Sequence, residues 1–145
     1  FAFTSSDSKS AEAKRLGAHH AVNSTVDAEL ARIKGKLDFI LVTANADLNW
    51  GGYIETLAPG GRLHFVGVPP SPVTTHAFPL IAGQKSIAGS PLGSPATIRD
   101  MIDFCARHSI LPVTEHFEMT KANEALHHLE SGKARYRIVL KNDLR

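Results

Sequence analysis

The fold of this chain is decided by the segment Leu37-Asp38-Phe39-Ile40-Leu41-Val42-Thr43. Its apolar residues fall on both faces of an extended backbone, and the apolar run has the length of a strand. Strands that are apolar on both faces are typical of parallel sheets that are covered by helices. The segment therefore predicts a buried strand of a parallel sheet.

Short apolar strands alternate with amphipathic helices on the N-terminal side of this segment. We expect, in order, a strand at Phe1–Thr4, a helix at Ser8–Leu16, a strand at Ala21–Val22 and a helix at Asp27–Lys34. Each helix is followed by a glycine, Gly17 or Gly35. Glycine is favoured there because it accepts the left-handed conformation that ends many helices.

The alternation continues on the C-terminal side. We expect a helix around Leu48–Leu57, a turn at Pro59-Gly60-Gly61, a strand at Arg62–Val68 that stops at Pro69-Pro70, and a short strand at Lys85–Ser90. A helix should then begin after Ser94 as N-cap, with Pro95 in its first turn, and run to about His108. Its apolar face would carry Ile98, Ile102 and Cys105, and packing is the expected role of that cysteine.

The last helix and strand complete the pattern. We expect Thr120 to cap a helix that turns Ala122, Leu126 and Leu129 inward and ends at Gly132, followed by a closing strand at Tyr136–Lys141. Strands alternating with helices predict an α/β fold with a doubly wound, mainly parallel sheet. One domain is expected for 145 residues, with no internal repeat or long linker.

Composition narrows the classes of function. The net charge of +2 is small and the basic residues are scattered, which argues against a nucleic-acid-binding surface. No apolar run approaches the roughly 20 residues of a membrane helix. A single cysteine, Cys105, excludes an internal disulfide and favours a reducing compartment, so we expect a cytoplasmic protein. The first residues read as the interior of a strand, so we expect the chain to begin within a domain.

The first candidate site follows the opening strand and reads Thr4-Ser5-Ser6-Asp7-Ser8-Lys9. In dinucleotide-binding folds an acidic residue at the end of the second strand binds the ribose hydroxyl of NAD, whereas NADP requires groups that accept its 2′-phosphate. The hydroxyls, the Lys9 cation and a helix N-terminus favour a phosphate, with Asp7 expected to point away. The same pattern is also typical of a simple N-cap cluster, and spacing alone does not decide between them.

Two further segments lie where open α/β sheets bind ligands, beyond the carboxyl ends of strands. Gly67-Val68-Pro69-Pro70 is one, and a strand-ending turn is the alternative reading. Gly89-Ser90-Pro91-Leu92-Gly93-Ser94 is the other, with glycines that permit close backbone approach, and a strand-to-helix loop is its alternative. Asn49 and Trp50 are placed equally well for ligand contact or for packing.

The sequence offers no pattern for a metal site or an activated nucleophile. The eight histidines include two adjacent pairs, His19-His20 and His127-His128, and adjacent residues on a helix do not face one ion. Neither the His-x-x-x-His spacing nor a Cys-x-x-Cys pair occurs. A Gly-x-Ser-x-Gly nucleophile turn is absent as well. We therefore assign neither metal ligands nor catalytic residues to this chain.

Taken in order, these segments resemble the zinc-dependent medium-chain alcohol dehydrogenases. The resemblance rests on the opening Phe1–Lys9, on Ala13–Ala18, and on the strands around Leu37–Thr43, Leu63–Pro69 and Tyr136–Leu140. Residues 87–90 and 101–106 fit the same order. The chain is most similar to the cinnamyl-alcohol-dehydrogenase-like branch of NADP-dependent aldehyde reductases, over essentially its whole length.

The resemblance implies a Rossmann-like cofactor domain that is incomplete. Thr4, Ser5 and Lys9, with Ser6 nearby, would hold the 2′-phosphate of NADP, and Thr43 would lie against the cofactor. The nicotinamide half would contact a second set of residues: Gly67, Val68, Ser90, Pro91 and Leu92. The family's edge-to-edge dimer would use the strand Lys85–Ser90.

The departures from the family pattern are as informative. The first strand with its Gly-x-Gly-x-x-Gly turn and the catalytic zinc domain have no counterpart here, so residues 1–145 are expected to form a partial dinucleotide-binding domain with a closing strand. In the resembling fold the missing strand lies between the strands at Phe1 and Leu37. We expect the sheet to split there and expose sticky edges. The chain would then be unstable alone, take a strand from a partner, or belong to a longer protein.

The implied activity is hydride transfer between NADPH and an aldehyde or primary alcohol, with zinc acting as a Lewis acid outside this chain. This chain alone is expected to be inactive. Two other readings remain: a non-catalytic nucleotide-binding α/β module, and a zinc-free quinone reductase of the same superfamily. The sequence does not indicate the substrate.

Overall fold

The computed structural model describes residues 1–144, which divide into two compact units, unit 1 (residues 1–92) and unit 2 (residues 93–144). Unit 1 carries the elements β1 (Ala2–Thr4), α1 (Asp7–Arg15), β2 (Ala21–Asn23), α2 (Asp27–Arg32), β3 (Leu37–Val42), α3 (Trp50–Thr56), β4 (Leu57–Phe65), α4 (Ala77–Gly83) and β5 (Ser86–Gly89). Unit 2 carries α5 (Pro95–Arg107), β6 (Thr114–Glu118), a 3₁₀ turn at Met119–Lys121, α6 (Ala122–Glu130) and β7 (Arg137–Lys141). The mixed α/β class is confirmed.

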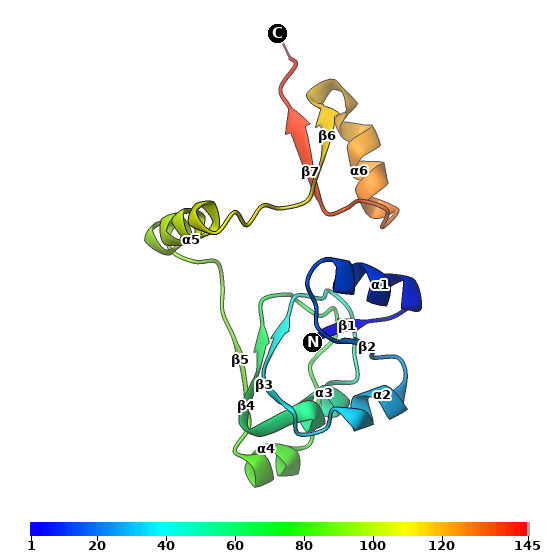
Figure 1. Ribbon diagram of the computed structural model, residues 1–145, viewed down its shortest axis with the longest axis vertical. Helices are drawn as coiled ribbons and strands as arrows, with labels where there is room; N and C mark the ends of the chain where they lie inside the picture. Colours follow the sequence, from blue (N-terminus) through cyan, green and yellow to red (C-terminus); the bar gives the residue numbers. More distant parts are fainter. Residues whose placement is uncertain (145) are drawn as a thin grey trace. The chain divides into compact units, whose positions relative to one another are not determined.

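Within residues 1–144 all strand pairs are parallel, and the strands form three separate sheets (Figure 1). In unit 1, β1 pairs with β2, and β3-β4-β5 form a second sheet. In the common doubly wound order 3-2-1-4-5-6, the sequence β2, β1, β3, β4, β5 corresponds to places 3, 2, 4, 5 and 6. Within residues 1–144 no strand occupies place 1, so the expected split between β1 and β3 is confirmed.

The central segment forms the predicted strand of a parallel sheet, but only one of its faces is buried. Ile40 lies opposite Leu63, which in turn lies opposite Ile87. The core of unit 1 collects around these strands, and its members are Val22, Leu30, Ile33, Leu37, Ile40, Val42, Trp50, Tyr53, Leu57 and Leu63. One face of β3 is nevertheless open, because Phe39 and Leu41 remain more than half exposed.

The expected turn at Pro59-Gly60-Gly61 lies inside a strand instead. Strand β4 begins at Leu57, which pairs with Leu37, and the next pair joins Arg62 to Phe39. Residues 58–61 therefore bulge opposite a single residue of β3. Gly60 takes a φ of +76°, which glycine accepts without strain. The glycine thus bends the backbone, but the bend is a bulge within β4 and not a turn that ends a strand.

Two elements were not expected from the sequence. Helix α4 contains Pro79, a residue that usually breaks helices, but it lies in the first turn, where the backbone N–H groups have no partner within the helix. Strand β6 reads Thr-Glu-His-Phe-Glu, and its polar residues hide the strand pattern. Strand β4 also ends earlier than expected, because it stops at Phe65 and leaves Gly67 and Val68 in the following loop.

The last helix differs from the expectation in its cap and in its buried face. Lys121 is the N-cap residue and makes no side-chain capping bond, whereas Thr120 donates its hydroxyl to Asp143 at 2.7 Å. Ala125 is the buried residue of α6, and Leu126 and Leu129 are about half exposed, at 55% and 51%. As an N-cap, the Thr120 hydroxyl would accept a hydrogen bond from a helix N–H group, whereas here it donates a charge-assisted hydrogen bond to the Asp143 carboxylate.

Helix α5 begins as expected, with Ser94 accepting a hydrogen bond from the Thr97 N–H at 3.2 Å and Pro95 in the first turn. Its apolar face is less covered than expected, since Ile98 and Ile102 are exposed and Cys105 is only partly buried. Periodicity identifies an apolar face but not the surface that covers it. No helix in residues 1–144 has both the length and the apolar character needed to cross a bilayer.

Candidate functional site

The carboxyl ends of β1 and β3 border one hollow of about 570 Å³ in unit 1. Thr4 and Ser5 line it from the β1 side, together with Lys9 of α1, and Thr43 lines it from the β3 side. Its volume lies within the range of about 300–1,000 Å³ that is usual for ligand pockets. Four of the residues that the sequence predicted to contact the cofactor therefore line the same hollow.

The β1 side of the hollow presents hydroxyl groups and one cation. The Lys9 ammonium donates to the Ser5 hydroxyl at 3.4 Å, and the Thr4 and Ser10 hydroxyls are 2.9 Å apart. Ser6 has a different task, because its hydroxyl accepts from the Lys9 backbone N–H and caps α1. The segment therefore contains both a helix cap and a candidate site. Ser6 is the N-cap of α1, and the neighbouring Ser5 lines the hollow.

The electrostatics of the hollow favour an anion. Lys9 is the only charged side chain among the described residues that line it, and Asp7, the first residue of α1, is not among them. The N-terminus of the nine-residue α1 lies next to Ser5 and adds the positive end of its dipole. Hydroxyls, an ammonium and a helix N-terminus together suit a phosphate group.

Two buried aromatic residues form the floor of the hollow. Trp50 and Tyr53 are each 5% exposed, and Trp50 packs edge-on against Phe65 with ring centroids 5.1 Å apart. Burial raises the pKa of the Tyr53 hydroxyl, and a hydrogen bond with Ser24 opposes the shift, so the phenol is protonated at neutral pH. Asn49 caps α3 by accepting from the Gly52 N–H at 3.0 Å. Trp50 therefore packs in the core and also lines the hollow, whereas Asn49 is the N-cap of α3.

Gly67 lies against the backbone of β3 and not in the hollow. Its N–H donates to the Val42 carbonyl at 2.9 Å. A Cβ placed on it would lie 2.7 Å from both the Ala44 oxygen and the Thr43 carbonyl carbon. Close approach does require glycine at this position, but the approaching group is protein backbone. Its neighbour Val68 is 77% exposed.

The segment Ser90-Pro91-Leu92 is also outside the hollow. The Ser90 hydroxyl and the His64 ring nitrogen are 2.9 Å apart, and Leu92 is 93% exposed. The structure therefore brings together Thr4, Ser5, Lys9 and Thr43, and it leaves the residues expected at the nicotinamide half in separate loops at the ends of β4 and β5.

Several lining residues were not singled out from the sequence. They are Ser24, Ala44, Ala46, Leu48 and Tyr53, in addition to residues 1–3 and to residues 40–42 of β3. Most carry no distinctive chemistry, so residue type gave no signal. Position did offer one, because residues 44–48 directly follow the carboxyl end of the central strand.

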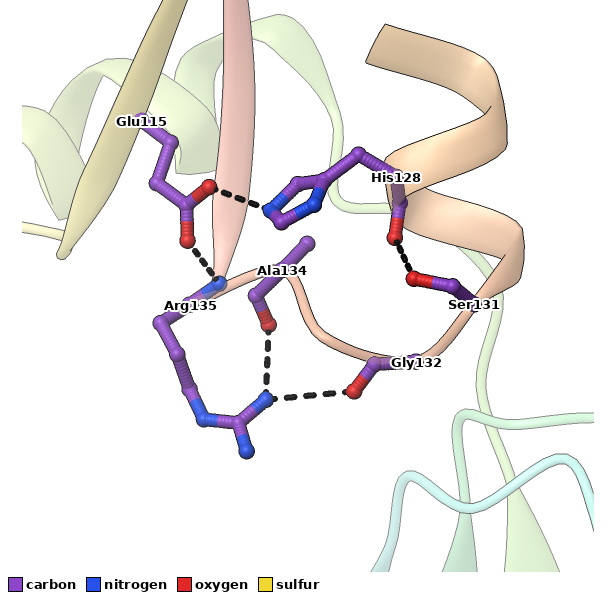
Figure 2. Close-up of polar contacts among 6 residues, drawn as sticks. All are labelled: Glu115, His128, Ser131, Gly132, Ala134 and Arg135. Atoms are coloured by element: carbon purple, nitrogen blue, oxygen red, sulfur yellow. Dashed lines mark hydrogen bonds and ion pairs between the residues drawn. The ribbon is translucent and has the colours of Figure 1, made fainter. Parts of the chain in front are cut away.

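Unit 2 contains a separate polar cluster around Glu115 (Figure 2). One carboxylate oxygen lies 2.6 Å from the His128 ring nitrogen, and the other accepts the Arg135 backbone N–H at 2.6 Å. The Arg135 side chain in turn donates to the carbonyls of Gly132 and Ala134. These bonds, the Arg135 N–H above all, lower the pKa of Glu115. The cluster closes the connection between α6 and β7, which is a structural role.

Neither unit offers a metal-binding cluster in the part of the chain that the structure describes. No group of three histidine, cysteine, aspartate or glutamate side chains is arranged to hold an ion within residues 1–144. The residues present therefore do not fit a zinc ion, and no chemical step is assigned to one here.

The sequence profile of the zinc-binding dehydrogenases matches residues 1–107. An aldehyde reductase, AdhA, from Synechocystis sp. is 53% identical over 139 residues, which cover 96% of this chain and 41% of that protein. The structure is similar to a cinnamyl alcohol dehydrogenase from Sorghum bicolor, with a TM-score of 0.89, 33% identity, and coverage of 95% of this chain and 39% of the other.

A second solved structure is the CAD from Helicobacter pylori complexed with NADP(H), with a TM-score of 0.78 and 29% identity over 95% of this chain and 39% of that one. The chain spans about two fifths of the length of the relatives that it matches. These similarities extend over both units, and the profile match ends at the last residue of α5.

Proposed function

The chain belongs to the zinc-binding dehydrogenase family, and from that premise we propose that it forms the cofactor-binding portion of an NADP-dependent alcohol dehydrogenase or aldehyde reductase. The enzyme would transfer hydride between NADPH and an aldehyde or a primary alcohol. The observation that carries the proposal is the hollow between β1 and β3, where Lys9 is the only charged side chain among the lining residues that the structure describes.

The residues around the hollow have distinct roles in this proposal. Thr4, Ser5 and Lys9 donate hydrogen bonds and positive charge to the 2′-phosphate, with Ser6 fixing the start of α1 beneath them. Thr43 bounds the cofactor from the β3 side. The bound nicotinamide supplies or accepts the hydride, and the protein orients it. Gly67, Val68 and the segment Ser90-Pro91-Leu92 form the loops assigned to its nicotinamide half.

The substrate class is taken from the family and from the printed names of similar proteins, an aldehyde reductase and cinnamyl alcohol dehydrogenases. Zinc would be held by residues outside positions 1–144, since none of these positions forms a suitable cluster. Positions 1–145 would therefore act as a partial dinucleotide-binding domain with a closing strand, inactive by itself. We place the protein in the cytoplasm, in keeping with its single cysteine.

We also propose a homodimer through β5. Among the described residues, β5 pairs only with β4, and its other edge is unpaired. Ile87 on this strand is 37% exposed. A lysine at this edge discourages pairing between sheets. The variant Ile87→Lys should therefore sediment as a monomer at concentrations where the wild type sediments as a dimer, and identical sedimentation would refute this edge as the interface.

The phosphate site is tested by the variant Ser5→Asp in binding titrations with NADPH and NADH. A carboxylate at this position would neutralise Lys9 and repel the 2′-phosphate. We expect the dissociation constant for NADPH to rise about tenfold, or about 1.4 kcal/mol. The constant for NADH should change by less than about twofold, because NADH lacks the repelled group.

A matched control is Ser8→Asp, which adds the same charge in the first turn of α1 but does not line the hollow. It should leave the preference for NADPH nearly unchanged. If Ser5→Asp also leaves the ratio of the two constants unchanged, the 2′-phosphate does not bind at this site.

A further inference from the structure

The two loops that follow β3 and β4 run together behind the hollow. At their start, the backbone N–H groups of Val66 and Gly67 both donate to the Val42 carbonyl, at 3.0 and 2.9 Å. The absence of a side chain at Gly67 lets its backbone touch Thr43 and Ala44. The start of the loop after β4 therefore contacts the backbone at the end of β3 and at the start of the loop that follows β3.

A second connection joins the loops farther from the sheet. One oxygen of the Asp47 carboxylate accepts the Ser71 backbone N–H at 3.0 Å, and the other accepts the Ser71 hydroxyl at 2.8 Å. Two hydrogen bonds to one carboxylate fix its orientation as well as its distance, and charge makes each stronger than a neutral bond. We call this pair the Asp47–Ser71 clip.

The clip lies on the back of the wall of the hollow. Ala46 and Leu48, on either side of Asp47 in the sequence, both line the hollow, whereas Asp47 does not. Thr43 and Ala44 at the start of the same loop line it as well. The loop thus presents one set of residues to the hollow while the Asp47 side chain ties it to the β4 loop.

We infer that Asp47 is a positioning residue for the cofactor, acting through the clip to hold residues 43–48 as a preformed wall. The inference rests on the proposed function of the hollow. A wall fixed before binding lowers the cost of ordering it when the ligand arrives. Asp47 would contribute to binding of the whole dinucleotide, but not to the grip on its 2′-phosphate, which Thr4, Ser5 and Lys9 supply from the opposite side.

The test compares Asp47→Ala with wild type in calorimetric titrations of the chain with NADPH and with adenosine 2′,5′-bisphosphate, which carries the 2′-phosphate but no nicotinamide. We expect the dissociation constant for NADPH to rise about fivefold, the effect of losing two net hydrogen bonds that order the wall. The constant for the bisphosphate should change by less than about twofold. A general loss of folding would raise the dissociation constants of both ligands by similar factors. The test is therefore whether the constant for NADPH rises more than the constant for the bisphosphate.

Two variants make the comparison specific. Ser71→Ala keeps the backbone donor and loses only the hydroxyl, so it should show a smaller increase for NADPH than Asp47→Ala. Asp143→Ala removes a matching clip in unit 2, where Asp143 accepts the backbone N–H and the hydroxyl of Thr120 at 3.0 and 2.7 Å. It should leave the affinity for both ligands unchanged.

A ligand-free readout separates this inference from the proposed function. Hydrogen exchange of the backbone amides of residues 43–48 should be faster in Asp47→Ala than in wild type. Unchanged exchange, or equal weakening of NADPH and the bisphosphate, would overturn the role of Asp47. Equal wild-type affinity for the bisphosphate and for AMP would instead overturn the phosphate site, and the clip would still be judged by the exchange rates.

Discussion

Unit 1 and unit 2 achieve order by different means. Unit 1 has a contiguous apolar core in which Leu57 and Leu63 are completely buried, at 0% exposure. In the described part of unit 2, Ala125 is the only residue in the buried class. Large apolar side chains of α5, among them Met101 and Phe104, are half exposed. The candidate site therefore stands on the unit that has a core of its own.

Unit 2 relies on charged hydrogen bonds in place of an apolar core. The carboxylate of Glu115 joins β6 to α6 and to the start of β7, and that of Asp143 holds Thr120 in the turn before α6 (Figure 2 shows the first of these). Hydrogen bonds of this kind specify local geometry but contribute less net stability than burial of large side chains. We therefore expect a cavity to destabilise unit 1 more than unit 2, and acid to weaken the hydrogen-bonded structure of unit 2.

The largest effect is expected from a cavity in unit 1. Leu63→Ala should lower the free energy of unfolding by about 2–5 kcal/mol, because it removes a fully buried side chain from the central sheet. Urea unfolding followed by the fluorescence of Trp50 measures this free energy for unit 1, because Trp50 is the single tryptophan of the chain and lies in that unit.

The matched variant in unit 2 is Leu129→Ala, at a position that is 51% exposed. Its cost should stay below about 1 kcal/mol, and the Trp50 transition should not move. Equal losses from the two variants would contradict the difference between the units.

A smaller loss is expected where the loop after β4 contacts the loop after β3. Gly67→Ala would place a Cβ 2.7 Å from the backbone of Ala44, and backbone cannot yield as a flexible side chain does. We expect a destabilisation of about 1–3 kcal/mol in the same urea assay. Gly51→Ala is the control, since its Cβ would meet only the Asn49 side chain at 3.7 Å. A neutral Gly67→Ala would show that the loops are not held in this contact.

Acid should loosen unit 2 through its carboxylates. The Arg135 backbone N–H, first among several groups, lowers the pKa of Glu115 below its ordinary 4.5, and the Thr120 hydroxyl and N–H lower that of Asp143 below its ordinary 3.8. A carboxyl whose pKa is lowered on folding stabilises the folded state above its ordinary pKa, and the benefit is lost as the pH falls through the folded-state value. Protection of the β6 and β7 amides from hydrogen exchange should therefore decline below about pH 4.5.

The variant Glu115→Gln sharpens this prediction, because it keeps the size of the side chain and removes its titration. Protection of β6 and β7 should be weaker than in wild type at pH 6 and should change less on acidification. Parallel pH profiles for the two proteins would assign the acid response to other groups.

The contrast between the units also explains which features of the fold and of the site could be predicted from the sequence. The central strand of unit 1 was predictable because its residues form a continuous apolar run, Phe39–Val42, although one face of the strand is exposed in the structure. The polar cluster that lines the hollow was recognisable because hydroxyls and a lysine follow a strand. The partners in space were not predictable: Asp47 and Ser71 are both ordinary loop residues, and only the fold brings them together.

In unit 2, sequence reasoning failed where polar contacts replace packing. Thr120 fits the pattern of a helix cap, but the acceptor that it binds, Asp143, lies 23 residues away. Leu126 and Leu129 have the spacing of a buried face, yet both are half exposed. Periodicity reports which side of a helix is apolar and contains no information about whether a surface covers it.

An NADP site between β1 and β3 is tested most directly by hydrogen exchange of the chain with saturating NADPH, with saturating NADH, and without ligand. We expect slower exchange in residues 4–9 and 43–48 with NADPH, a smaller effect in residues 4–9 with NADH, and no change in β6 and β7. Equal protection of residues 4–9 by the two cofactors, or protection confined to unit 2, would contradict the placement of the NADP site between β1 and β3.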